Sequence, residues 1–152
     1  FKQEFDEVAT DKTPLTENPF KDSNEVKTYI KTISKRIDSE GLSPVVATYL
    51  VHNYGKQTDR ILEIFEKIDK KEAPFRLMVA ELKYCLTHEM VCTPLDFFIR
   101  RTGRMYFDKP SVASSKESIL AAFSSHFKWN QKTAEYHKKQ LDITLQNTVE
   151  FV

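Results

Sequence analysis

Charged side chains gather in residues 89–104, and their spacing suggests ion pairs. Asp96 and Arg100 are four residues apart, so a helix here would place them on one face, where they can pair. Arg101 is rotated by about 100° from Arg100, so the two arginines must serve different neighbours. One of them can brace this domain internally, also through Glu89, and the other is free to reach a loop or another domain. The same arginines also suit the C-terminal end of a helix dipole. We expect Glu89, Asp96, Arg100 and Arg101 to be structural or interdomain residues, and we predict no catalytic residue.

A second cluster has residue types that bind metals. Cys85, His88, Glu89 and Cys92 lie within eight residues. A structural zinc site needs four ligands, and no second pair with metal-ligand spacing occurs elsewhere in the sequence. The alternative is that Cys85 belongs to the core and that His88 and Glu89 end a helix. We therefore predict no metal site and no disulfide.

The glycines decide against a nucleotide site. Gly41, Gly55 and Gly103 are the only three, and none are close enough to form G-x-G-x-x-G or a P-loop. A G-x-S-x-G nucleophile elbow is also missing. The sequence predicts no cofactor-binding residue in this chain.

Composition and charge narrow the class of protein further. The 152 residues are 40% hydrophobic, and 23 basic residues nearly balance 22 acidic ones, which argues against nucleic acid as a partner. No run of about 18 apolar residues is present, and two cysteines fit a reducing compartment. Residues 1–22, with Pro14 and Pro19, are expected to be a linker or arm from a preceding domain.

The elements that must position these residues are helices. Apolar residues recur at helical spacing in almost every segment of residues 23–152. Ser23 or Asn24 is expected to cap the first helix, and Ser43 and Thr93 each precede a proline in a cap-plus-proline signal. Later helices are expected to begin at Ser115 and after Asn130, and residues 104–108 are β-like but too short to start a sheet. The predicted fold class is all-α, a single compact domain of about six or seven helices.

Two segments resemble a known family. Residues 49–55 (YLVHNYG) and 81–108 (ELKYCLTHEMVCTPLDFFIRRTGRMYFD) are similar to the C-terminal helical domain of FAD-dependent glycerol-3-phosphate dehydrogenases and alpha-glycerophosphate oxidases. The most specific marks are Glu89 shortly before Thr93-Pro94-Leu95-Asp96, followed by Arg100-Arg101-Thr102. The resemblance covers roughly residues 20–150.

The resemblance implies a role for the longer protein. Family members oxidise sn-glycerol 3-phosphate to dihydroxyacetone phosphate, with electrons passing to quinone or oxygen. FAD and substrate are held by preceding domains of the same polypeptide, so FAD is expected in the full-length protein and none in this fragment. A bacterial, cytoplasmic enzyme with peripheral contact to the inner face of the cell membrane is expected. A free-standing helical protein-interaction module with no catalytic role is the alternative.

Overall fold

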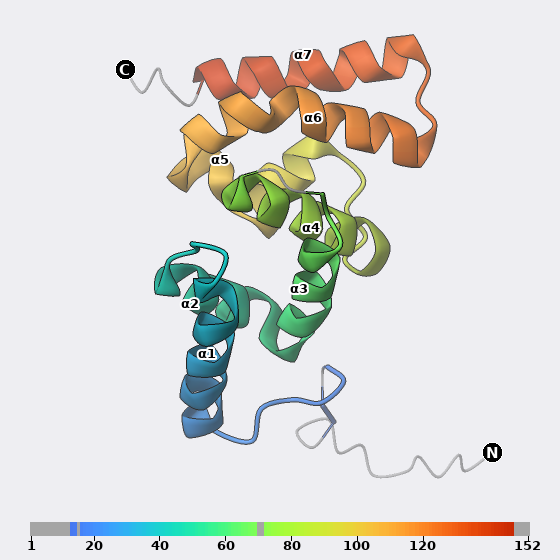
Figure 1. Ribbon diagram of the computed structural model, residues 1–152. Helices are drawn as coiled ribbons and strands as arrows, with labels where there is room; N and C mark the ends of the chain where they lie inside the picture. Colours follow the sequence, from blue (N-terminus) through green and yellow to red (C-terminus); the bar gives the residue numbers. More distant parts are fainter. Residues whose placement is uncertain (1–12, 15, 70–71, 148–152) are drawn as a thin grey trace, which may run out of the picture. The chain divides into compact units, whose positions relative to one another are not determined.

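The regular secondary structure of the described residues is entirely helical. The computed structural model describes residues 13–14, 16–69 and 72–147, which contain seven α-helices and no strand (Figure 1). The expected all-α fold is confirmed. Contacts divide the chain into two compact units, residues 1–59 and 60–152.

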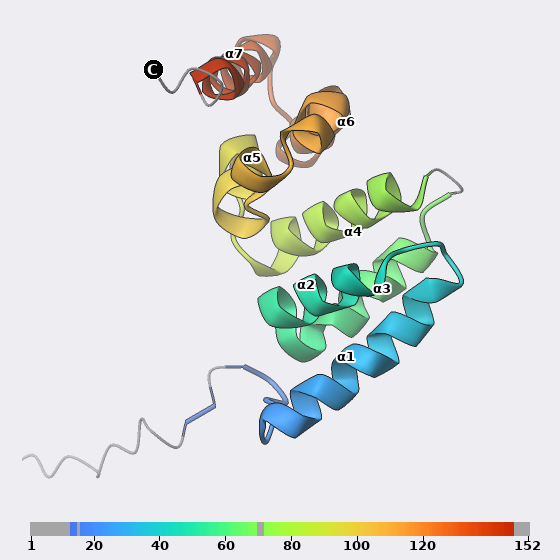
Figure 2. The same cartoon turned by 90° about the vertical axis from the view of Figure 1, so that its left-hand side faces the viewer.

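The first unit is a pair of packed helices. Helix α1 (Ser23–Asp38) lies against α2 (Pro44–Tyr54), which leads into the short 3-10 helix η2 (Gly55–Gln57) (Figure 2). Ile33, Ile37 and Leu50 are buried in this unit. Ser43 caps α2 ahead of Pro44, as expected. The cap of α1 differs from the expectation: the Asp22 carboxylate accepts from the amides of Asn24 and Glu25, each at 2.8 Å.

The last residues before α1 pack on this unit. The Phe20 ring lies 5.4 Å from the Tyr29 ring, between centroids, and the Lys56 ammonium lies 5.2 Å from the Phe20 centroid. Lys56 also pairs with Glu25 at 2.6 Å. The Tyr29 hydroxyl donates to Asp59 at 2.8 Å, and burial together with this bond raises the pKa of Tyr29. An arm over residues 1–22 stays a prediction, and residues 1–12 and 15 lie outside the described part.

The second unit is built around α4. Helix α3 (Thr58–Glu66) begins at the division between the units, and α4 (Ala73–His88) follows it with eight buried residues. Next come the π-helix η3 (Asp96–Arg101), the four-residue α5 (Arg104–Phe107), α6 (Lys109–Phe127) and α7 (Gln131–Asn147). Helix α4 contacts η3 and α6, and α7 runs alongside α6 (Figure 1).

Two segments fold differently from their sequence patterns. Helix α6 begins at Lys109, six residues before the predicted start at Ser115, because the Asp108 carboxylate caps it and Pro110 fits its first turn. Residues Arg104–Phe107, β-like in composition, form helix α5. Asn130 caps α7 as expected, accepting from the Thr133 amide at 2.9 Å.

Aromatic rings stack where α6 turns into α7. The Trp129 ring lies 4.2 Å from the His137 ring and 5.8 Å from Phe123, between centroids, and both pairs are nearly parallel. Burial lowers the pKa of His137, and the Asp96 carboxylate opposes this change. The stack therefore favours a neutral imidazole beside the chain's single tryptophan.

Candidate interdomain site

Arg101 joins the end of α4 to the end of η3. Glu89 is the residue after α4, and its carboxylate accepts from Arg101 Nη1 at 2.9 Å. Arg101 Nη2 donates to the Glu89 carbonyl oxygen at 2.7 Å. One guanidinium thus satisfies both a side chain and a backbone carbonyl left open by the helix end. The burial of Tyr84, followed by the nearby Glu89 carboxylate, raises the pKa of Tyr84.

Arg100 points to a different neighbour. Its Nη1 donates to Asp96 Oδ1 at 3.0 Å, along the same π-helix. The Arg100 side chain is 78% exposed, so this pair contributes little to stability. The predicted i,i+4 pair is present, and the structure gives each arginine its own partner.

Glu81 and Arg104 form a buried ion pair that the sequence pattern does not predict. Glu81 on α4 is fully buried, and its Oε2 accepts from Arg104 Nη2 of α5 at 2.8 Å. Arg104 Nη1 also approaches Asp108 at 3.4 Å. The two partners are 23 residues apart, so no helical spacing links them. The only sequence signal is an acidic residue between Ala80 and Leu82 in an apolar stretch of α4.

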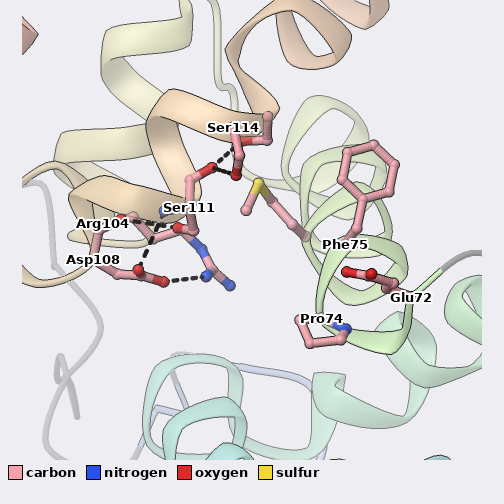
Figure 3. Close-up of a pocket in the computed structure, with 9 residues that line it drawn as sticks. Glu72, Pro74, Phe75, Arg104, Asp108, Ser111 and Ser114 are labelled. Atoms are coloured by element: carbon pink, nitrogen blue, oxygen red, sulfur yellow. Dashed lines mark hydrogen bonds and ion pairs between the residues drawn. The ribbon is translucent and has the colours of Figure 1, made fainter.

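A cavity of about 460 Å³ lies beside Arg104 and Asp108 (Figure 3). Pro74, Phe75 and Met78 of α4 form its apolar wall, and residues of α5 and α6 form its polar wall. The serine hydroxyls of that wall donate to backbone carbonyls at the start of α6: Ser111 to the capping residue Asp108, and both Ser114 and Ser115 to Ser111. The described residues that line the cavity include no histidine, so within them these serines have no adjacent imidazole to activate them as nucleophiles.

The cysteine and histidine cluster is dispersed by the fold. Cys85 is buried, whereas Cys92 is exposed and its thiol donates to the Met90 carbonyl. His88 Nδ1 lies 2.6 Å from the Thr87 hydroxyl, and its ring stacks on Tyr84 at 4.6 Å. Within the described residues, no three potential ligands converge on a metal position.

The residues present do not fit a flavin site of the dinucleotide-binding type. Such a site needs a strand, a glycine-rich turn and a helix N-terminus that receives the pyrophosphate. The described segments contain no strand. Gly55 and Gly103 have positive φ angles of 55° and 65°, and they form a turn after α2 and the turn before α5.

Comparison with known proteins identifies the family. The family described as the C-terminal domain of alpha-glycerophosphate oxidase matches residues 9–134. This match spans more than half of the sequence, and the chain belongs to this family. The resemblance found in residues 49–55 and 81–108 is thereby confirmed.

Relatives named as a dehydrogenase and as an oxidase share this domain. The chain is 28% identical to the aerobic glycerol-3-phosphate dehydrogenase of Bacillus subtilis, over 97% of its own length and 27% of that protein. It is 29% identical to the alpha-glycerophosphate oxidase of Enterococcus casseliflavus, over 80% of the chain and 19% of that protein. It therefore spans about a quarter or less of the length of these relatives.

A solved structure has the same fold. The glycerol-3-phosphate dehydrogenase from Bacillus halodurans, complexed with FAD, matches with a TM-score of 0.72 and 25% sequence identity. The match covers 84% of this chain and 26% of that one. The helical arrangement described above thus recurs as one part of a longer FAD-binding polypeptide.

Proposed function

We propose that this chain is the C-terminal accessory domain of a bacterial FAD-dependent enzyme that oxidises sn-glycerol 3-phosphate to dihydroxyacetone phosphate. Electrons pass to quinone or to oxygen. The observation that carries the proposal is the family match over residues 9–134. Relatives named as dehydrogenase and as oxidase support it, and so does the FAD complex of the Bacillus halodurans protein. The family match favours this function over a free-standing interaction module.

Within that enzyme, this chain has a structural role, and FAD and substrate are held by other domains of the polypeptide. In the part of the chain that the structure describes, no glycine-rich turn of the dinucleotide-binding type is present and no histidine lies beside the serines of the cavity. Both observations support this division of labour. Glu89, Asp96, Arg100 and Arg101 serve as structural and interdomain residues. Arg101 braces two helix ends of its own domain, and the exposed Arg100 is in a position to meet another domain.

Flavin retention tests the proposal directly. The 152-residue chain and the full polypeptide from the same gene are each purified after incubation with excess FAD, and their visible spectra are compared. We expect stoichiometric flavin and glycerol 3-phosphate oxidation with the full polypeptide, and neither with the shorter chain. Comparing the rate of oxygen uptake with the rate of quinone reduction then identifies the electron acceptor. Flavin held by the shorter chain alone would contradict its accessory role, and a gene without a flavin domain would refute the enzyme assignment.

The enzyme is cytoplasmic and contacts the inner face of the cell membrane peripherally. No helix in the described part of the chain has the length and apolarity to cross a bilayer. Lys128 and Lys132 flank Trp129 at the α6–α7 turn, an arrangement that suits an anionic lipid surface. Co-sedimentation of the full polypeptide with anionic but not neutral vesicles is the expected result. Equal recovery with both vesicle types would remove the membrane contact from the proposal.

A further inference from the structure

Helix α5 holds two neighbouring aromatic side chains out in solvent. Tyr106 is 60% exposed and Phe107 is 89% exposed, which makes Phe107 one of the most exposed large apolar residues described. The two rings meet edge to face, 6.5 Å apart between centroids. We name this pair, Tyr106 and Phe107, the aromatic knuckle.

The backbone beneath the aromatic knuckle is fixed from several sides. Met105, between Arg104 and Tyr106, is fully buried. Arg104 is tied to the buried Glu81 at 2.8 Å. The amides of Tyr106 and Phe107 both donate to the Gly103 carbonyl, at 3.0 and 3.2 Å. Because Met105 fills the core side of this short helix, the two aromatic rings cannot turn inward without extracting it.

This arrangement differs from a single apolar side chain exposed on a protein surface. Single exposed apolar residues are common and need no partner. Two adjacent aromatics on an anchored backbone instead provide large contact area with little conformational entropy to lose on binding. Buried tyrosine and other aromatic anchors dominate the energetics of protein interfaces. The aromatic knuckle has the features of such an anchor.

We infer that the aromatic knuckle docks this domain onto the remainder of its own polypeptide, with Tyr106 and Phe107 entering an apolar recess of the flavin-binding part. This inference rests on the proposed function. The occupant follows from length: the chain spans only 26% of the Bacillus halodurans protein and 27% of the Bacillus subtilis protein. A polypeptide with about three quarters of its length outside this domain supplies a partner at high effective concentration.

Melting temperatures of matched variants test the docking. Tyr106→Ser and Phe107→Ser are compared with Tyr136→Ser, whose tyrosine on α7 is 58% exposed and so matches Tyr106. Each is made in the 152-residue chain and in the full polypeptide. We expect both knuckle variants to melt several degrees lower in the full polypeptide and unchanged in the 152-residue chain. The Tyr136→Ser variant should leave both proteins unchanged.

Oxidative footprinting provides a readout that does not depend on variants. Hydroxyl radicals should label Tyr106 and Phe107 several-fold less in the full polypeptide than in the 152-residue chain, with Tyr136 labelled equally in both. Equal labelling of the knuckle in both proteins would overturn the inference. So would knuckle variants that destabilise the short chain as much as the full one, or protection that requires a concentration-dependent dimer. Flavin content and glycerol 3-phosphate oxidation are measured separately, so a failure of docking and a failure of the proposed enzyme function give different results.

Discussion

Glu81 and Arg104 form a buried ion pair that the spacing of residues in the sequence does not predict. A fully buried carboxylate is tolerated only with a partner, and the guanidinium at 2.8 Å supplies it. The pair joins α4, which has eight buried residues, to the short α5. Sequence spacing identified the exposed Asp96–Arg100 pair because four residues make one helical turn. It missed Glu81–Arg104 because only tertiary packing brings those residues together.

Removing the Glu81 charge should be costly. We expect Glu81→Gln to lower the free energy of unfolding by about 3 kcal/mol, since a largely buried arginine would lose its counter-charge. Asp108 remains near Arg104 and keeps the loss at the low end of the usual range. Glu117→Gln is the matched control, because Glu117 pairs with Lys138 in solvent; its effect should stay below about 1 kcal/mol. Urea unfolding followed by circular dichroism measures both, and equal losses would contradict a special role for the buried pair.

His137 should report on pH through Trp129. Burial places the pKa of His137 below its usual value of 6.5. The stability contributed by the neutral ring is therefore complete above pH 6.5 and is lost as pH falls through the lower, folded-state pKa. We expect the emission of Trp129, the only tryptophan, to change with a midpoint below pH 6.5 while the protein stays folded. His137→Gln should abolish that transition and His126→Gln should retain it; a midpoint at or above 6.5 would be inconsistent with the burial.

At the scale of elements, local sequence signals predicted most helices and failed at the start of α6 and over the π-helix η3. Ser43-Pro44 and Asn130 acted as the sequence predicts, because a cap needs only its own first turn. The start of α6 was missed because its first turn is polar, although Asp108 and Pro110 carried a usable signal. The sequence pattern does not predict the π-helix. In its wider turn the Thr102 amide donates to the Phe97 carbonyl, five residues back, and this turn does not change the spacing of apolar residues.

Gly103 and Gly41 allow a comparison of two left-handed turns. Both have positive φ, at 65° and 72°, so alanine at either is strained and should cost about 1 kcal/mol. A Cβ on Gly103 would also lie 3.2 Å from the Phe107 ring, whereas one on Gly41 would meet nothing within 4 Å. Because the Phe107 ring is exposed it can yield, and we expect Gly103→Ala and Gly41→Ala to lose similar stability in urea unfolding. A much greater loss for Gly103→Ala would mean that the ring cannot move.

At the scale of the whole molecule, the two arginines of η3 should separate stability from docking. Arg101 bonds the end of α4, so Arg101→Ala should lower the melting temperature of both the 152-residue chain and the full polypeptide. Arg100 is mostly exposed in this chain, so Arg100→Ala should act in the full polypeptide alone. Under the proposed function, flavin reduction by saturating glycerol 3-phosphate should stay near the parental rate in both variants, because neither residue is catalytic.

Stopped-flow measurement of the reductive half-reaction checks this expectation. A variant that keeps its melting temperature yet loses that reaction by orders of magnitude would place its arginine in the active site.

The family and these charged residues could be predicted from the sequence alone, because both depend on short contiguous motifs. It gave no sign of the aromatic knuckle, since exposure is a property of the folded chain.

The small number of buried residues in helix α7 determines where local unfolding of the second unit begins. Of its described residues only Leu141 is buried, and salt-sensitive pairs such as Lys116–Asp142 hold it on α6. Helix α4, by contrast, has eight buried residues. Local unfolding begins in helices that bury few apolar side chains. We therefore expect the amide hydrogens of α7 to exchange with solvent through local openings and those of α4 to exchange only on global unfolding, which hydrogen-exchange mass spectrometry measures. Added salt widens that difference because it weakens the pairs on α7 and leaves the apolar face of α4 in place.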